Sequence, residues 1–278
     1  PEGVFNLVHG SGSEVGHPLS LHRDIAAVSF TGSTNAGAKV SEASSSTFKK
    51  ISLELGGKNP TIVFADADLK DAVAGAMRAA FTNQGQVCLC GSRILVERKI
   101  HDQFLSELVK ATKQMKIGNP SDKNVDLGAV ISHEHRDKVE EYIQLGIEEG
   151  GRIECGGKRP DLGAPWNNGA FLEPTIISGL SPNCRTATEE IFGPVATVHS
   201  FETEEEAVAI SNSVNYGLAA SVWTRDLSRA HRVSANLESG MVWVNTWLLR
   251  DLRVPFGGMK DSGVGRVVQR GWWRYISV

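Results

Sequence analysis

Two short segments decide how this chain folds: Leu-Glu-Leu-Gly-Gly-Lys at residues 53–58, and Phe-Thr-Asn-Gln-Gly-Gln-Val-Cys at residues 81–88. The first places a carboxylate, Glu54, at the end of an apolar run that stops at two glycines. The second places a thiol, Cys88, just after a stretch with helical periodicity. A carboxylate in a partly dry place tends to have a raised pKa, which suits a general base, and a thiol is a strong nucleophile. Together the segments predict covalent catalysis on a carbonyl.

Short apolar runs alternate with stretches of helical periodicity along the chain. We expect strands at residues 4–8, 26–30, 51–55, 61–64, 93–96, 196–201, 219–224 and 241–245. We expect helices after an N-cap at Asp68 and at residues 101–115, 133–149, 204–213 and 228–236, and a loop over residues 155–170. Strands that alternate with helices predict an α/β fold with a mainly parallel sheet.

A glycine-containing turn, Thr-Gly-Ser-Thr-Asn-Ala-Gly at residues 31–37, follows one of the predicted strands. Strand, glycine turn and helix in this order are typical of a phosphate site at a helix N-terminus. The turn is neither G-x-G-x-x-G nor a Walker sequence, so a plain helix start is an equally good interpretation from the residues alone. Residues 189–194, Glu-Glu-Ile-Phe-Gly-Pro, read on the same grounds as an acidic turn that leads into a strand.

The composition narrows the class of protein. The chain has 278 residues, of which 41% are hydrophobic and 22% are charged, with a net charge of -3. These values predict a soluble, cytoplasmic globular protein without the basic stripe of a nucleic-acid binder. No apolar run approaches the roughly 18 residues of a membrane span. The chain begins at Pro1 without a leader, and we expect it to be a fragment.

Four cysteines, Cys88, Cys90, Cys155 and Cys184, fit neither a zinc framework nor a disulfide scaffold. We therefore expect reduced thiols and no metal site. Cys88 on composition alone is most simply a buried structural cysteine, because that is what most cysteines are. Cys90 is given no role.

Both segments resemble the active-site signatures of the aldehyde dehydrogenase superfamily, and the likeness runs over residues 1–266. The resemblance implies that Cys88 is the nucleophile and that Glu54 is the base. It implies an aldehyde dehydrogenase-like fold, with a partial Rossmann-type coenzyme domain over residues 1–55 and an α/β catalytic domain over residues 56–260.

The resemblance also implies a coenzyme site. In the family Phe-Thr-Gly-Ser-x-x-x-Gly binds the pyrophosphate, so Gly32, Ser33 and Gly37 are expected to contact the cofactor. Glu190 is expected to bind the nicotinamide ribose, and Phe192 to pack beside the nicotinamide. The expected cofactor is NAD, and NADP stays open because the residues that read the adenine ribose are missing from this sequence.

Residues 245–258 resemble the segment that lines the substrate tunnel in the branch containing the 2-aminomuconic semialdehyde dehydrogenases. In that branch an arginine reads a substrate carboxylate, a role that Arg250 suits because a guanidinium grips a carboxylate with two hydrogen bonds. Phe256 is expected to wall the pocket. The alternatives are a surface arginine paired with Asp251 and an aromatic ring that only packs.

The resemblance leaves three possible functions for the chain. The first is oxidation of a small-molecule aldehyde, with neither nucleic acid nor membrane as a partner. The second is a non-catalytic protein that keeps the fold, and the third is a thiol esterase that needs no cofactor. Family members are homo-oligomers, but we expect an atypical tail over residues 261–278 in place of their oligomerisation strand.

Overall fold

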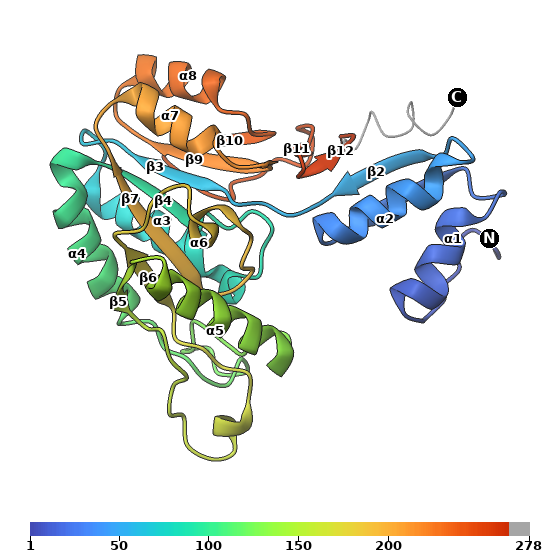
Figure 1. Ribbon diagram of the computed structural model, residues 1–278, viewed down its shortest axis with the longest axis horizontal. Coiled ribbons are helices and arrows are strands. Elements are labelled where there is room, and N and C mark those ends of the chain that lie inside the picture. The colour runs from blue at the N-terminus through green and yellow to red at the C-terminus, as the bar shows by residue number, and fades with distance from the viewer. Residues whose placement is uncertain (267–278) are drawn as a thin grey trace.

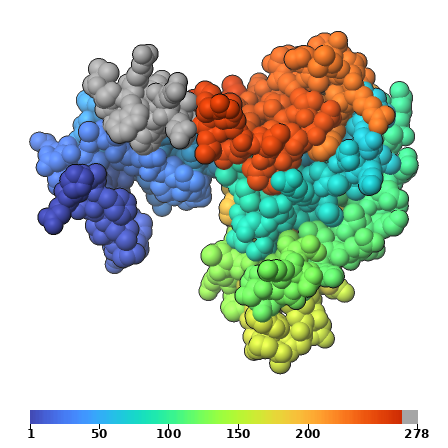
Figure 2. Space-filling view, turned by 180° about the vertical axis from the view of Figure 1, so that it is seen from behind, coloured from blue at the N-terminus to red at the C-terminus, as the bar shows by residue number. Residues whose placement is uncertain are grey.

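The structure is a computed structural model that describes residues 1–266. An N-terminal segment, drawn in blue, stands apart from a larger α/β body, and strand β2 (Lys50–Glu54) points from one to the other (Figure 1). The space-filling view shows an open hollow between the two parts (Figure 2). The predicted tail lies outside the described residues from position 267 onward.

The body is built on a seven-stranded sheet with the order β10-β9-β3-β4-β7-β6-β5. All neighbouring strands run parallel except β5 and β6, which are antiparallel. The strands are β3 (Pro60–Val63), β4 (Arg93–Glu97), β5 (Arg152–Cys155), β6 (Thr175–Ser178), β7 (Val195–Phe201), β9 (Ala219–Trp223) and β10 (Met241–Val244). Every residue of β3, β6 and β9 is buried, as expected for a parallel sheet that is covered on both faces.

Helices cover the two faces of this sheet (Figure 1). On one face α3 (Leu69–Phe81) and α4 (His101–Thr112) pack on a core that includes Ile176, and on the other α5 (His133–Glu148) packs on Ile177. Successive side chains of a strand point to opposite faces, which places these helices on opposite sides. Asp68 caps α3 as predicted, since its Oδ1 accepts a hydrogen bond from the Asp71 N–H at 3.2 Å. The remaining helices are α6 (Arg185–Thr188), α7 (Glu204–Asn212) and α8 (Leu227–Asn236).

A smaller sheet with the order β1-β2-β12 carries the N-terminal segment. β1 (Ala27–Thr31) and β2 are parallel, and the late strand β12 (Gly263–Val264) pairs antiparallel with the end of β2, opposite Glu54. α1 (His17–Leu21) and α2 (Thr34–Ser45) lie beside this sheet, and β8 (Tyr216–Gly217) pairs with β11 (Met259–Lys260) elsewhere. Residues far apart in the sequence therefore meet where β2 ends.

Most predicted elements form within one to three residues of their expected bounds, but the strand predicted over residues 4–8 is wrong. Those residues form no strand, and Val4 and Phe5 are 75% and 83% exposed. A strand needs a neighbour for its N–H and C=O groups, and none of the described strands lies beside this segment. The domain boundaries stay a prediction. Within residues 1–266, no helix is both long and apolar enough to cross a bilayer.

Candidate active site

Glu54 is the last residue of β2, and its environment raises its pKa. Burial raises the pKa of its carboxyl group from 4.5 to about 7, against the opposing effect of the positive charges of Arg266 and Arg250. Neither carboxylate oxygen has a hydrogen-bond partner among the described residues, although both are buried. The backbone around it is held firmly, since its carbonyl accepts a hydrogen bond from the Gly32 N–H at 3.1 Å. A free carboxylate with a pKa near neutrality suits a general base, as the sequence predicts.

The loop that presents Cys88 bends sharply after α3. Asn83, Gln84 and Gly85 follow one another with φ angles of 52°, 57° and 70°, all in the left-handed region. A side chain at Gly85 would place its Cβ 2.1 Å from the carbonyl oxygen of Gly193, so only glycine fits there. Backbone strain of this kind is typical of functional sites. The bend turns the chain out of the helix and towards the sheet.

Cys88 is half-buried, and its pKa is raised. Burial is the main cause, followed by the negative charges of Glu190 and Glu54, while its own N–H and the charge of Arg250 act in the opposite direction. The N–H of Cys88 thus favours the thiolate, but burial and the two negative charges outweigh it. Because the charge of Glu54 raises the pKa of Cys88, the carboxylate and the thiol lie in the same site.

Two glycines allow three segments to meet at this site. The N–H of Gly57 donates to Oε1 of Glu190 at 2.9 Å, and a Cβ on Gly56 would lie 2.3 Å from the other carboxylate oxygen. A Cβ on Gly57 would lie 2.8 Å from the carbonyl oxygen of Cys88. Any larger residue at either position would push these segments apart. The turn after β2 thus brings the base, the thiol and Glu190 together, and burial raises the pKa of Glu190 as well.

The predicted phosphate turn lies on the other side of Glu54, between β1 and α2. Ser33 caps α2, because its Oγ accepts a hydrogen bond from the Ala36 N–H at 3.2 Å. Gly37 allows the helix to pack closely on the small sheet, since a Cβ there would lie 2.4 Å from Leu55. A hollow of about 700 Å³ lies between the α1 region and α2 and is lined by residues of both. Residues of β1 also line this hollow, whereas Gly32, Ser33 and Gly37 do not, so the predicted phosphate contacts lie outside it.

Phe192 lies in the loop before β7, where its φ of 58° is unusual for an aromatic residue. The residue is 36% exposed, and its carbonyl accepts a hydrogen bond from Nε2 of His135 at 2.7 Å. The loop is thereby tied to α5, and the Phe192 ring lies edge-on to the ring of His135, with centroids 6.3 Å apart. Phe192 lines a small hollow together with Gly57, Val87 and Glu190, so the structure places it beside the Cys88 turn.

Arg250 and Phe256 contact one another, with the guanidinium carbon 4.3 Å from the ring centroid. The alternative is a surface arginine paired with Asp251. This pairing is wrong, because Asp251 binds Arg253 at 2.9 Å instead, but Arg250 is exposed, as that alternative expects. The charge of Arg250 lowers the pKa of both catalytic candidates, so its guanidinium lies near the site. Phe256 packs against the same apolar cluster as Cys88.

Sequence reasoning assigned no role to two residues that support the turn after β2. Lys58 is fully buried, its Nζ donates to the carbonyl of Thr186 at 2.9 Å, and burial lowers its pKa to about 7. Ser262 donates from Oγ to the carbonyl of Gly56 at 2.6 Å and accepts from the N–H of Gly217 at 3.0 Å. Lys58 belongs to the segment 53–58, so its position in the sequence could have suggested a role. No local sequence pattern suggests a role for Ser262.

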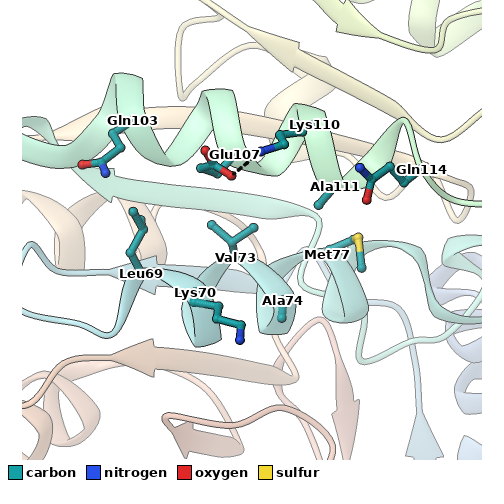
Figure 3. Close-up of a pocket in the computed structure, with 10 residues that line it drawn as sticks. All are labelled: Leu69, Lys70, Val73, Ala74, Met77, Gln103, Glu107, Lys110, Ala111 and Gln114. Carbon is teal, nitrogen blue, oxygen red and sulfur yellow. Dashed lines mark ion pairs between the residues drawn. The ribbon is translucent and has the colours of Figure 1, made fainter.

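A second hollow, of about 470 Å³, lies between α3 and α4. Figure 3 shows Leu69, Val73 and Met77 of α3 facing α4, where Glu107 and Lys110 form an ion pair at 3.7 Å. None of the predicted site residues lines it. Within residues 1–266, no three His, Cys, Asp or Glu side chains are grouped as metal ligands.

Comparison with known proteins identifies the family of this chain. Residues 1–278 match the model of the aldehyde dehydrogenase family. The chain is 50% identical over 268 residues to 2-aminomuconic semialdehyde dehydrogenase of Danio rerio, covering 96% of this chain and 55% of the relative. It is also 50% identical over 266 residues to betaine aldehyde dehydrogenase of Bacillus subtilis (strain 168), covering 96% of this chain and 54% of that relative.

A solved structure agrees with the fold. A double mutant of betaine aldehyde dehydrogenase from Staphylococcus aureus, in complex with NAD+, superposes with a TM-score of 0.96 at 43% identity, covering 99% of this chain and 55% of that one. The chain thus spans about half the length of the curated relatives it matches. The predicted α/β fold is confirmed, and the chain belongs to the aldehyde dehydrogenase family.

Proposed function

We propose that this chain carries the chemistry that oxidises an aldehyde to a carboxylic acid, with Cys88 as nucleophile and Glu54 as base. The observation that carries the proposal is a partner-free carboxylate with a pKa of about 7 beside a half-buried thiol. The two groups are joined through the Gly57 turn, and the charge of Glu54 acts on the sulfur. Family membership and the names of the relatives support the same class of reaction.

NAD is the proposed cofactor, because the S. aureus relative holds NAD+ and the described residues suit a dinucleotide. Gly32, Ser33 and Gly37 would face the pyrophosphate at the start of α2, whose positive end favours an anion. Glu190 would hold the nicotinamide ribose, and Phe192 would pack beside the ring. NAD, when bound, accepts the hydride that leaves the substrate carbon. NADP remains an alternative to be tested.

The protein's own groups perform the covalent steps. Cys88 reacts as its thiolate, after the thiol proton has left to solvent, and its sulfur bonds to the aldehyde carbon, which forms the oxyanion of a thiohemiacetal. The N–H of Cys88 donates to the oxygen that becomes negative. After loss of hydride the carbon is a thioester. Glu54 then takes a proton from water, the oxygen of that water adds to the carbon, and the acid leaves as the thiolate is restored.

The proposed substrates are semialdehydes that carry a carboxylate. Relatives named 2-aminomuconic and 2-hydroxymuconic semialdehyde dehydrogenase support this class, whereas equally similar relatives are named for betaine aldehyde. Arg250 favours the first group, because its positive charge at the site attracts a carboxylate and repels a cationic ammonium. A higher kcat/KM for 2-hydroxymuconic semialdehyde than for betaine aldehyde is the expected result.

The decisive experiment measures NADH formation from a semialdehyde by the purified chain, beside the full-length D. rerio relative as a positive control. Cys88→Ser should abolish the signal, and Glu54→Gln should stop turnover after one product per site. NAD titration of both proteins separates a binding defect from a chemical one. Ester hydrolysis without cofactor would instead favour the thiol esterase. No activity of either kind from a folded protein would favour the non-catalytic alternative.

We further propose a cytoplasmic location and no partner beyond the small molecules. Whether the chain assembles into homo-oligomers, as expected for the family, is tested by size-exclusion chromatography with light scattering. A monomer would fit the expectation that the oligomerisation strand is replaced.

A further inference from the structure

A single buried side chain ties the nucleophile loop to the sheet. Nδ2 of Asn59 donates to the carbonyl of Cys88 at 2.8 Å and to the carbonyl of Cys90 at 2.9 Å. Its Oδ1 accepts a hydrogen bond from the N–H of Ala219, the first residue of β9, at 3.0 Å. The residue is only 3% exposed, so water cannot replace these bonds.

The carbonyl between these two is also taken by a buried donor. Nε1 of Trp247 donates to the carbonyl of Leu89 at 2.9 Å, and the tryptophan is buried. Three consecutive carbonyl groups therefore bind side chains from outside the loop. Peptide planes held in this way have little freedom to rotate.

Asn59 connects the segment that carries Glu54 with the segment that carries Cys88. It stands five residues after Glu54, on the segment that carries the base, and directly before β3. Its side chain reaches the segment that carries Cys88. The amide is therefore a direct side-chain link between the base segment and the nucleophile segment.

The Cys88 N–H shares its peptide plane with the carbonyl of Val87 and lies next to the Cys88 carbonyl that Asn59 binds. The carbonyl of Val87 accepts a hydrogen bond from the Cys90 N–H at 2.9 Å, which makes residues 87–90 a tight turn. Asn59 holds the carbonyls of Cys88 and Cys90 in that turn from outside. The N–H of Cys88, which favours the thiolate and faces the developing oxyanion, keeps its direction only while the turn is held.

We propose that Asn59 is a positioning residue for the nucleophile: it holds the Cys88 turn against β9, so that sulfur and N–H keep their reactive directions relative to Glu54. The catalytic part of this inference rests on the proposed function, whereas the effect on the thiol does not. Misplacement of a reacting group by about 1 Å costs on the order of 100-fold in rate, so we expect Asn59→Ala to lower kcat by about 10- to 100-fold. KM for the aldehyde should change by less than about threefold, because the tunnel residues stay in place.

The test measures alkylation of Cys88 by iodoacetamide as a function of pH, with mass spectrometry of the labelled peptide. In Asn59→Ala the midpoint for Cys88 should rise by about half a pH unit or more, because the N–H that favours the thiolate loses its direction. Cys184, which is also half-buried, serves as the internal control and should keep its profile. Asn212→Ala is the matched variant, since that asparagine also bridges two backbone groups, Asn236 O and Glu238 N–H, at 2.9 Å each, away from the site.

The possible outcomes distinguish failure of the positioning role of Asn59 from failure of the proposed aldehyde oxidation. An unchanged Cys88 midpoint in folded Asn59→Ala overturns the positioning role, whether or not the native chain oxidises aldehydes. A raised midpoint supports it even if no NADH forms, in which case the proposed function alone fails. If Asn59→Ala does not fold, Asn59→Ser is measured instead, because its hydroxyl keeps a donor for one carbonyl. A Cys88 profile equal to that of the native chain then overturns the inference.

Discussion

The carboxyl group of Glu54 should make the stability of this protein depend on pH in a way that Glu54→Gln removes. Burial raises the pKa of Glu54 to about 7 in the folded protein, whereas the unfolded chain has the ordinary value of 4.5. Below about pH 4.5 both states hold the proton, so the group costs nothing. As the pH rises from 4.5 to 7 the unfolded state ionises first, and the free energy of unfolding falls. Above about pH 7 the loss is complete.

The size of this effect follows from the two pKa values. Their difference corresponds to about 3.4 kcal/mol at 1.36 kcal/mol per pKa unit. The two oxygens are buried but the residue keeps some contact with solvent, so we reduce the expected effect to about 1.5–2 kcal/mol. The glutamine amide also loses hydration in this site, at a cost that does not vary with pH. The change between two pH values is therefore the quantity to measure.

Equilibrium urea unfolding at about pH 4.5 and about pH 8.5 provides that measurement. Relative to the native chain, Glu54→Gln should gain about 1.5–2 kcal/mol of unfolding free energy between the first pH and the second. Glu42→Gln, at an exposed position of α2, is the control and should follow the native chain at both pH values. Equal pH dependence of native and Glu54→Gln protein would refute the assignment of a raised pKa to this carboxyl group.

Three further substitutions probe the loop, the substrate side and the charge around the thiol. Gly85→Ala should lower the free energy of unfolding by more than about 2 kcal/mol, measured by urea titration, because its φ is 70° and the new Cβ would meet Gly193. Arg250→Ala should lower kcat/KM about 10- to 100-fold for a carboxylated aldehyde and leave an uncharged aldehyde nearly unaffected, and equal losses for both would contradict a carboxylate contact. Glu190→Gln should lower the pH midpoint for alkylation of Cys88, because the negative charge of Glu190 raises the pKa of that thiol; an unchanged midpoint would count against this coupling.

Local patterns predicted most of the secondary structure because they depend on neighbours in the sequence. The apolar face of α3 and its cap at Asp68 are periodic features that need no knowledge of the fold. The strand predicted over residues 4–8 does not form, because strand formation depends on a partner that the local sequence does not reveal. Its alternation was correct for a strand, but a strand exists only beside another strand, and the described residues provide none.

The candidate site shows the same division. The residues that resemble family signatures were found, but their supporting partners were not. Ser262 binds Gly56 across 206 residues of sequence, and Asn59 binds Ala219 across 160. The sequence around Asn59 or Ser262 does not predict these contacts, because the packing of distant segments decides which hydrogen-bond partner each side chain meets.

The sequence by itself determined the family, most of the helices, part of the strands, and the thiol and carboxylate on which the proposed chemistry depends. Only the tertiary structure decided that the pKa of Cys88 is raised, since burial and the charges of Glu190 and Glu54 outweigh the favourable N–H. It also decided that Glu190 reaches the Gly57 turn, 133 residues away. A pKa depends on which charges and how much water surround a group, and those surroundings exist only once the chain has folded.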